Sequence, residues 1–185
     1  MIYDSYSWKQ DLMARKRTII KYNNPVFLSE DSAHICNIIE KSIFYSAFII
    51  RKLVDCKVKV SDDVDKYAFN VYCISPKKHI NLLNRLPDYD NYDWKTIKVE
   101  QVQGCKICNW LIHSYVFLLY YYEGQDKIEG FYVSSDYDRN KILYDIKLKD
   151  WLKYMEFVAK DDIVFSRFSF SVKDNDFKYS CKKRG

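Results

Sequence analysis

Apolar residues recur at helical spacing in the first segment of the chain. Trp8, Leu12 and Ile19 fall on one side of a helix predicted for residues 6–22, whose remaining positions are largely polar and basic. An Asn-Asn-Pro sequence at 23–25 ends this helix, because the residue before a proline is pushed out of helical geometry. The segment therefore predicts a short, basic, amphipathic helix.

The strongest helical pattern covers residues 29–57. Its apolar positions follow a spacing of three and four residues, and further aromatic side chains widen the stripe, so we expect burial on more than one side. Ser29, followed by acidic residues, is the predicted N-cap, since a serine side chain accepts hydrogen bonds from the amides of the first turn. This helix is the predicted centre of the fold.

From residue 68 onwards the pattern changes largely to β. It predicts strands at 68–75, 95–101 and 141–148, a hairpin within 115–135, helices at 101–115 and 149–162, and a half-buried strand at 163–172. Helices thus come first, and an antiparallel β meander with an inserted helix follows, an order typical of an α+β fold. Because the sequence shows neither an internal repeat nor a linker, we expect residues 1–185 to form a single domain.

Aromatic residues are unusually frequent, with 17 Tyr, 11 Phe and 4 Trp. The formal net charge of +5 permits contact with a polyanion without requiring it. Local basic clusters contain Arg15, Lys16 and Arg17 and, further along, Lys77 and Lys78. Together with exposed tyrosines, these five residues form the predicted nucleic-acid-binding surface, because single-stranded RNA is held by aromatic stacking beside positive charge.

Six cysteines would suit an oxidised, secreted protein, but the first residues lack the apolar core of a signal peptide. The longest purely apolar run, residues 115–122, is too short to span a bilayer. Four of the cysteines lie within apolar patterns, where a reduced thiol behaves as a small hydrophobic group. We therefore expect a reduced, cytoplasmic protein without a membrane partner.

The sequence CKICNWLIH, residues 105–113, is the main candidate for chemistry. Cys105 and Cys108 form a CxxC pair and His113 is a third potential zinc ligand, but structural zinc usually needs four ligands and the sequence offers no second pair. A redox pair would need the CxxC at a helix N-terminus after a strand, and the strongly apolar continuation argues against it. We expect neither metal nor cofactor, and packing in the core is the expected role of both thiols.

The run from Cys108 to His113 also resembles the active-site signature of the HEPN superfamily, helical domains found in many RNA-cleaving toxins and antiviral defence proteins. That signature is an Arg, a polar residue that is often Asn, a few variable residues and then a His. Asn109 and His113 match it, while Cys108 stands where the family has Arg. The resemblance implies a homodimer in which two motifs meet, with His113 as general base for a ribose 2′-OH and a cation such as Arg51 stabilising the phosphate charge.

Other catalytic signatures are absent from the sequence, which contains no GxGxxG, P-loop, GxSxG or HExxH motif. Two hypotheses of function follow. The leading one is a small soluble binding or interaction protein without a catalytic site, whose partner is a protein or RNA, in the defence or toxin–antitoxin setting that the HEPN resemblance implies. The alternative is a divergent, metal-independent ribonuclease that uses His113 and Asn109.

Overall fold

The structure is a computed structural model that describes residues 3–121 and 127–183. Its helices are α1 (Ser5–Tyr22), α2 (Pro25–Glu30), α3 (Ser32–Asp55), α4 (Asp62–Lys66), α5 (Gly104–Ile112) and α6 (Leu148–Lys160). Its strands are β1 (Ala68–Ile74), β2 (Lys98–Gln103), β3 (Ser114–Tyr121), β4 (Ile128–Ser135), β5 (Leu143–Lys147), β6 (Ile163–Ser171) and β7 (Asp176–Lys183). The predicted α+β fold, with helices first and antiparallel strands after them, is confirmed.

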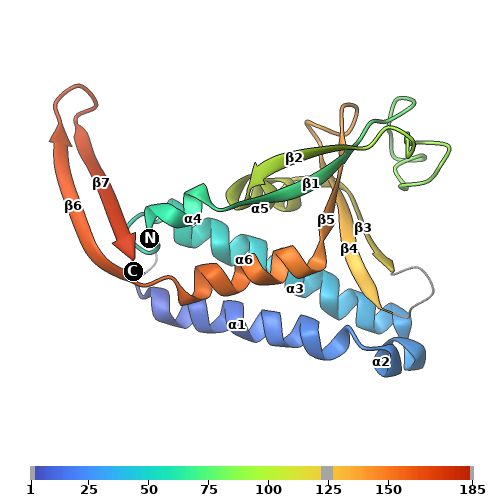
Figure 1. The fold of residues 1–185 in the computed structure, drawn as a ribbon, viewed down its shortest axis with the longest axis horizontal. Helices are drawn as coiled ribbons and strands as arrows, with labels where there is room; N and C mark the ends of the chain where they lie inside the picture. Colours follow the sequence, from blue (N-terminus) through green and yellow to red (C-terminus); the bar gives the residue numbers. More distant parts are fainter. Residues whose placement is uncertain (1–2, 122–126, 184–185) are drawn as a thin grey trace.

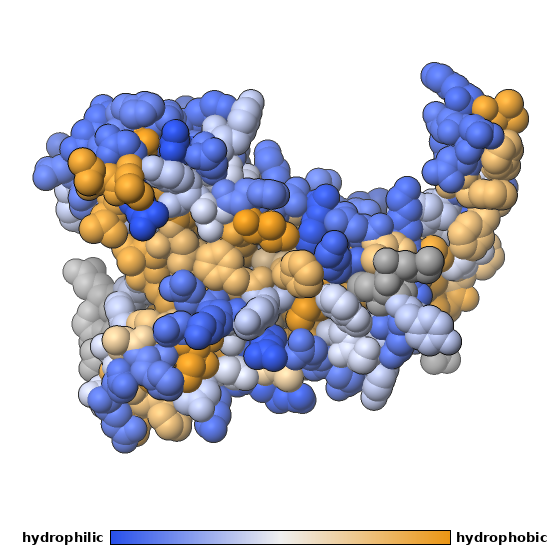
Figure 2. Space-filling model, turned by 180° about the vertical axis from the view of Figure 1, so that it is seen from behind, coloured by the Kyte–Doolittle hydropathy of each residue, from blue (hydrophilic) through white to orange (hydrophobic). Residues whose placement is uncertain are grey.

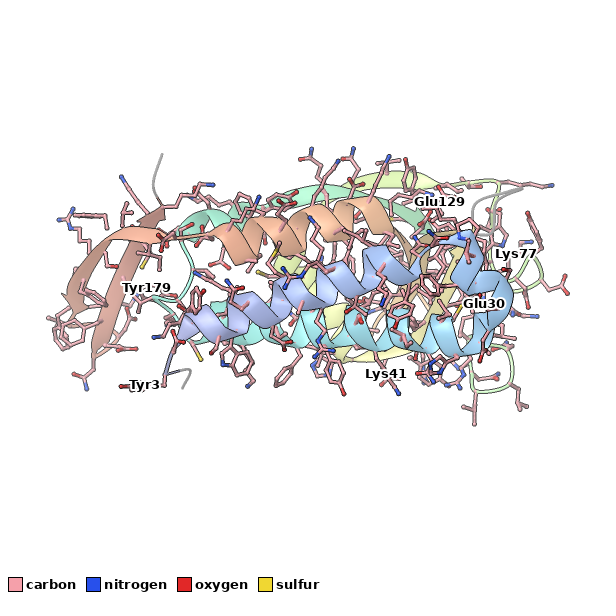
Figure 3. The ribbon with its side chains drawn as sticks, turned by 90° about the horizontal axis from the view of Figure 1, so that it is seen from below. Tyr3, Glu30, Lys41, Lys77, Glu129 and Tyr179 are labelled. Carbon is pink, nitrogen blue, oxygen red and sulfur yellow. The ribbon has the colours of Figure 1, made fainter. Side chains whose placement is uncertain are left out.

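Helices α1, α3 and α6 lie side by side along the molecule, with α1 packed against both of the others (Figures 1 and 3). The central position of α3 follows from its apolar stripe, because Ile39, Ile43 and Ile50 have no exposed surface. A buried hydrogen bond ties α6 to this layer, since the Trp151 indole donates to the Ser46 hydroxyl at 3.0 Å.

The start of α3 differs from the prediction. Ser29 belongs to the short helix α2, and the N-cap of α3 is Asp31, whose carboxylate accepts from the His34 amide at 3.0 Å. An aspartate satisfies the amides of the first turn as a serine would, and its charge suits the helix dipole. Ser29 was the wrong choice because Pro25, which is favoured at the first position of a helix, starts a separate turn before it.

The main sheet has the strand order β2-β1-β5-β4-β3, and all neighbouring strands are antiparallel. β3, β4 and β5 form the expected meander, and β5 then pairs with β1, which joins the two halves of the chain in one sheet. Helices α5 and α6 cover one face, where Val71, Phe131 and Ile146 contribute to the main core. Figure 1 shows this sheet above the helical layer.

The long connection between β1 and β2 covers one end of the other sheet face. A second, smaller core lies beneath it, formed by Ile74, Ile80, Tyr92, Val116 and Leu143. The outer side of this connection exposes several large apolar side chains, namely Leu82, Leu83, Leu86 and Tyr89. The connection is therefore anchored from within and apolar on its outer surface.

β6 and β7 form a separate two-stranded hairpin that projects from the body of the molecule (Figure 1). The half-burial predicted for residues 163–172 is wrong, because residues 164–170 are exposed on both faces of the hairpin. Apolar and polar residues do alternate along this strand, but the strand does not belong to the main sheet. β7 was not among the predicted strands.

Length and composition alone would allow α3 to cross a membrane. The core helix of a soluble protein passes the same test, and 44% of the most apolar stretch of α3 is buried inside the protein. The expected absence of a membrane partner therefore stays a prediction.

Candidate functional site

The predicted catalytic motif lies at the C-terminal end of α5. His113 is the C-cap residue of this helix, and its amide donates to the Asn109 carbonyl at 3.0 Å. The His113 carbonyl accepts from the Asp136 amide at 3.1 Å. The histidine is exposed and Asn109 is half-buried. The two residues therefore lie one helical turn apart at an accessible helix end.

Arg51 lies against a different part of α5. Its guanidinium pairs with Asp55, one turn later in α3, at 3.0 Å. Burial raises the pKa of the Cys105 and Cys108 thiols, and the positive charge of Arg51 opposes this rise with a smaller effect. The structure thus brings Arg51 to the N-terminal half of α5, and no described contact joins it to His113.

The CxxC pair packs around Tyr154 of α6. Cys108 is fully buried, and burial raises the pKa of its thiol well above the usual value. The Cys105 sulfur lies 3.4 Å from the Tyr154 hydroxyl oxygen and 3.5 Å from Asp65 Oδ1, and burial raises its pKa to about 11. Both thiols are therefore protonated near neutral pH and are weak nucleophiles. Among the described residues, no group of three His, Cys, Asp or Glu side chains is placed to hold a metal.

The predicted nucleic-acid-binding residues form two separate groups. Arg15, Lys16 and Arg17 lie in the middle of α1. Lys77 and Lys78 are exposed in the connection between β1 and β2, and Lys77 lies at the end of the molecule opposite to the β6–β7 hairpin (Figure 3). The structure therefore does not bring these five residues together on one surface.

Two of the three predicted nucleic-acid-binding residues on α1 already have acidic neighbours. Arg15 pairs with Asp11 at 3.2 Å, and the mostly buried Lys16 side chain pairs with Glu156 of α6. Arg17 is exposed. These pairs reduce the positive potential that a phosphate backbone would meet on α1.

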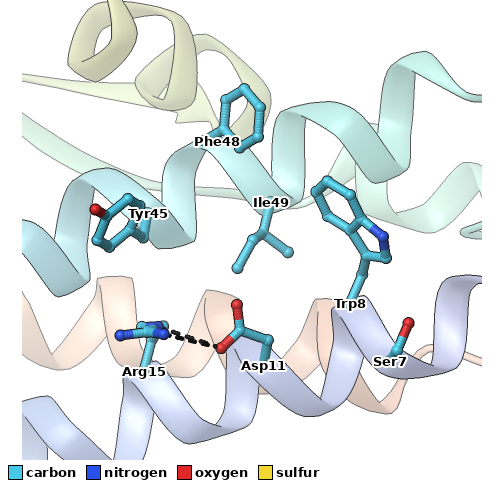
Figure 4. Close-up of a pocket in the computed structure, with 7 residues that line it drawn as sticks. All are labelled: Ser7, Trp8, Asp11, Arg15, Tyr45, Phe48 and Ile49. Atoms are coloured by element: carbon cyan, nitrogen blue, oxygen red, sulfur yellow. Dashed lines mark hydrogen bonds and ion pairs between the residues drawn. The ribbon is translucent and has the colours of Figure 1, made fainter. Parts of the chain in front are cut away.

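A shallow groove of about 400 Å³ lies between α1 and α3 (Figure 4). Trp8, Tyr45, Phe48 and Ile49 form its apolar lining, and the Arg15 guanidinium lies 5.4 Å from the centre of the Tyr45 ring. The groove is thus apolar, with the Arg15 cation at its side. This cation is already paired with Asp11, as Figure 4 shows.

A polar network that no sequence motif indicated lies on the sheet face away from the helices. The Tyr120 hydroxyl donates to Asp145 Oδ1 at 2.5 Å and accepts from the Lys147 ammonium at 2.9 Å. Lys147 also contacts Glu129 at 2.9 Å and Asp145 at 3.3 Å. Side chains of β3, β4 and β5 are thereby joined by charge-assisted hydrogen bonds.

The network controls the protonation of its own members. Burial raises the pKa of Asp145, although the hydrogen bond from Tyr120 and the charge of Lys147 oppose this rise. Burial alone would lower the pKa of Lys147, but the hydrogen bond to Glu129 and the charge of Asp145 raise it above its ordinary value. Because these groups are satisfied by one another, the network stabilises the sheet rather than offering a free base or nucleophile.

The β6–β7 hairpin has one apolar and one basic face. Because side chains alternate along a strand, the paired residues Phe168 with Tyr179 and Phe170 with Phe177 point to the same side. The pairs on the other side are Arg167 with Ser180, Ser169 with Lys178, and Phe165 with Lys182. Figure 2 shows the projecting hairpin, with apolar residues along its outer side and hydrophilic residues along the side nearer the body.

The apolar face is open to solvent. Phe168, Phe170 and Phe177 are 56%, 53% and 59% exposed, and the rings of Phe170 and Phe177 lie 5.2 Å apart in an edge-to-face contact. Scattered exposed apolar residues are normal on a protein surface, whereas a contiguous group of aromatic rings is not. This face is therefore the most distinctive surface feature of the hairpin.

The hairpin is attached to the body at its base. The Cys181 amide donates to Asp62 of α4 at 3.1 Å, and the Lys183 ammonium lies 3.5 Å from Asp63. Higher up, the Lys57 ammonium lies 5.1 Å from the centre of the Tyr179 ring. These contacts hold the lower part of β7 to the body, so that the phenylalanine rings extend beyond it.

A signal for β7 was present in the sequence. Phe177, Tyr179 and Cys181 alternate with polar residues, and the turn before them contains Asn175, which adopts a positive φ of 47°. Asparagine tolerates this conformation and is common in such turns. The intervening lysines give the segment the composition of a polar tail, so its apolar face is not evident from the sequence.

Comparison with known proteins gives no relative for this chain. No family model matches it, no curated protein sequence matches it, and no solved structure matches it. The HEPN resemblance therefore stays a prediction, and the function has to be inferred from the chain's own residues.

Proposed function

We propose that this protein is a protein-interaction module and that the apolar face of the β6–β7 hairpin is its binding surface. The observation that carries the proposal is the exposure of Phe168, Phe170 and Phe177 on a hairpin that projects from the body. Contiguous apolar surface of this kind marks places where proteins bind one another. Aromatic side chains are also enriched at the centres of such interfaces.

Burial of the three rings against a partner would supply a useful driving force. A phenylalanine gains about 1.5–3 kcal/mol when it passes from full exposure to full burial. Because each of the three is a little more than half exposed, their burial together is worth roughly 2.5–5 kcal/mol. A two-stranded hairpin is only marginally stable by itself, so a partner would also stabilise the hairpin.

A protein partner fits the surface better than RNA does. RNA binding needs positive charge gathered beside accessible aromatic rings. Arg15 and Lys16 are paired with carboxylates, while Lys77 and Lys78 belong to a different part of the surface. On the hairpin itself, Arg167, Lys178 and Lys182 point to the side opposite the phenylalanine rings, so these cations do not flank the rings on the apolar face.

A display library of random peptides, panned against the full-length protein, tests the proposal. We expect enriched peptides that bind the wild type and lose at least about tenfold in affinity for the variant Phe168→Ser/Phe170→Ser/Phe177→Ser. The matched control is Tyr3→Ser/Leu83→Ser/Tyr137→Ser, which removes three highly exposed side chains elsewhere. If no enriched peptide distinguishes the two triple variants, the proposal fails.

A metal-independent ribonuclease is the second candidate, favoured by the exposure of His113 at the end of α5. Incubation of a mixed RNA pool with the wild type and with His113→Ala tests it, because an exposed residue can be replaced with little effect on stability, about 0.5 kcal/mol or less. Cleavage by the wild type alone would support the enzyme. Absence of cleavage by both proteins would exclude it under those conditions and leave the interaction module.

A further inference from the structure

We infer that the partner of the hairpin is an extended acidic segment, with alternating apolar and acidic side chains, that adds as a strand to the outer edge of β6. This inference rests on the proposed function and adds to it the conformation and chemistry of the partner. An open strand edge, two faces of different chemistry and a positive charge support it.

The outer edge of β6 is open. In the described sheets β6 pairs only with β7, and β7 lies between β6 and the body of the molecule (Figure 1). The backbone groups along the other side of β6 are therefore a template for a further strand. Proline or several charges usually block such an edge, but residues 165–171 contain no proline and Arg167 is their one charged residue. The edge is thus competent for strand addition.

An added strand would extend both faces of the hairpin. On one side its residues would lie beside Phe168 and Phe170, and on the other side beside Arg167. Because successive residues of a strand point to opposite sides, the partner needs an apolar residue at every second position and a polar residue between them. The alternation of the partner follows from the alternation of β6.

The charge of the hairpin selects acidic residues for those polar positions. Residues 163–183 contain five basic and two acidic residues, a formal net charge of +3. Within the described part of the chain, Arg167, Lys173 and Lys182 have no ion-pair partner, and the pair of Lys178 with Asp174 is solvent-exposed. Carboxylates on an added strand would compensate these cations and would accelerate the encounter of the two chains.

The same charge disfavours a second copy of this chain as the occupant. Pairing of β6 with β6 of another molecule would bring together two hairpins that each carry a formal charge of +3. Like charges on neighbouring strands destabilise their pairing. An acidic segment avoids this repulsion and still buries the phenylalanine face.

The probe for this inference is an end-blocked peptide, as long as β6, in which Val and Glu alternate. Two control peptides have Val and Lys in alternation, or the same Val and Glu residues grouped in two blocks. We expect the alternating Val/Glu peptide alone to bind the full-length protein in a fluorescence-anisotropy titration. Its affinity should fall as the salt concentration rises, because salt screens the charge attraction.

Two further changes test charge and strand addition separately. Arg167→Glu/Lys182→Glu should weaken binding by at least about tenfold, whereas Lys77→Glu/Lys78→Glu, with the same change of net charge, should bind as the wild type does. Two N-methylated versions of the peptide are also made, one methylated at the odd-numbered residues and the other at the even-numbered residues. One version should lose binding and the other should retain it, because only every second amide of an added strand faces its neighbour.

The inference is overturned if the Val/Lys or block peptide binds equally well, if the charge reversal on the hairpin has no effect, or if both methylated versions act alike. Sedimentation of the wild type as a dimer that Phe168→Asp dissociates would also overturn it, in favour of a second copy. If the Val/Glu peptide does not bind, while the display-selected peptides bind in a way that depends on the phenylalanines, this inference alone is overturned. Failure of both would overturn the proposed function as well.

Discussion

Tyr120 of β3 lies directly over Gly130 of β4, so that a Cβ added at residue 130 would be 2.5 Å from the Tyr120 hydroxyl oxygen. This close approach lets the phenol cross β4 and reach Asp145 on β5, where its hydroxyl donates at 2.5 Å. The absence of a side chain at residue 130 is therefore a condition for the polar network on the sheet.

Gly130→Ala should destabilise the protein by about 1–3 kcal/mol, as overpacked core substitutions do. The added methyl would meet both the Tyr120 hydroxyl and the Ile146 carbonyl oxygen, the latter at 2.4 Å, and a backbone atom cannot rotate away. Urea unfolding measures the change. Asn70→Ala, at an exposed position of β1, is the control and should alter stability by no more than about 0.5 kcal/mol. Equal stability of Gly130→Ala and the wild type would refute the close packing.

Two Tyr→Phe substitutions should have different effects although they remove the same hydroxyl group. Tyr120→Phe takes away a hydrogen bond to a charged group and should cost about 1.5–3 kcal/mol. Tyr92 is fully buried, and its hydroxyl has no hydrogen-bond partner among the described residues, so Tyr92→Phe should be neutral or slightly stabilising. Paired urea denaturation of both variants checks this difference, and a similar loss in the two would contradict it.

The acid side of the stability profile should depend on Glu156. Hydrogen bonds from Lys16 and Lys160 lower the pKa of this carboxyl from 4.5 to about 2. A carboxyl whose pKa is lower in the folded state contributes stability above its unfolded value, and that contribution is lost as the pH falls from 4.5 towards 2. Glu156→Gln should therefore flatten the profile in this window.

Thermal unfolding at a series of pH values tests this prediction. The control is Glu30→Gln, at an exposed glutamate that forms no ion pair within the described part of the chain. Its profile should follow that of the wild type. An unchanged acid slope in Glu156→Gln would show that the link between α1 and α6 is not formed in solution.

The CxxC thiols should react slowly with alkylating reagents. Cys108 is fully buried and burial raises the pKa of Cys105 to about 11, so at pH 7.5 very little thiolate exists at either residue. Site-resolved mass spectrometry after iodoacetamide treatment measures the rates, and labelling in urea provides the fully accessible reference. Rapid labelling of Cys105 in the folded protein, or stoichiometric zinc in a native mass spectrum, would contradict the assignment of these thiols to packing.

The sequence predicted those parts of the fold that depend on local periodicity. The apolar spacing along α3 identified the central helix, while its start was misplaced because Ser29 and Asp31 are both good capping residues and only tertiary structure selects between them. The strand at 163–171 was recognised from its alternation. Its exposure was not, because alternation says that a strand has two faces but not what lies against each one.

The polar network could not be predicted from local patterns. Tyr120 and Asp145 are 25 positions apart, and they meet because β3, β4 and β5 are aligned in a particular register across Gly130. For the candidate site, the i, i+4 spacing of Asn109 and His113 was readable from the sequence. The position of Arg51 relative to them depends on how α3 packs against α5, which no spacing determines.

Amide hydrogen exchange, resolved to single residues with and without a display-selected peptide, tests the central claim most directly. In the free protein we predict fast exchange at every second amide within residues 166–170, namely at the amides that face the open edge of β6. Bound peptide should slow exchange within residues 163–183 and leave α5 and His113 unchanged. Protection of every β6 amide in the free protein, or peptide-induced protection confined to another surface, would contradict the assignment of this hairpin as the binding surface.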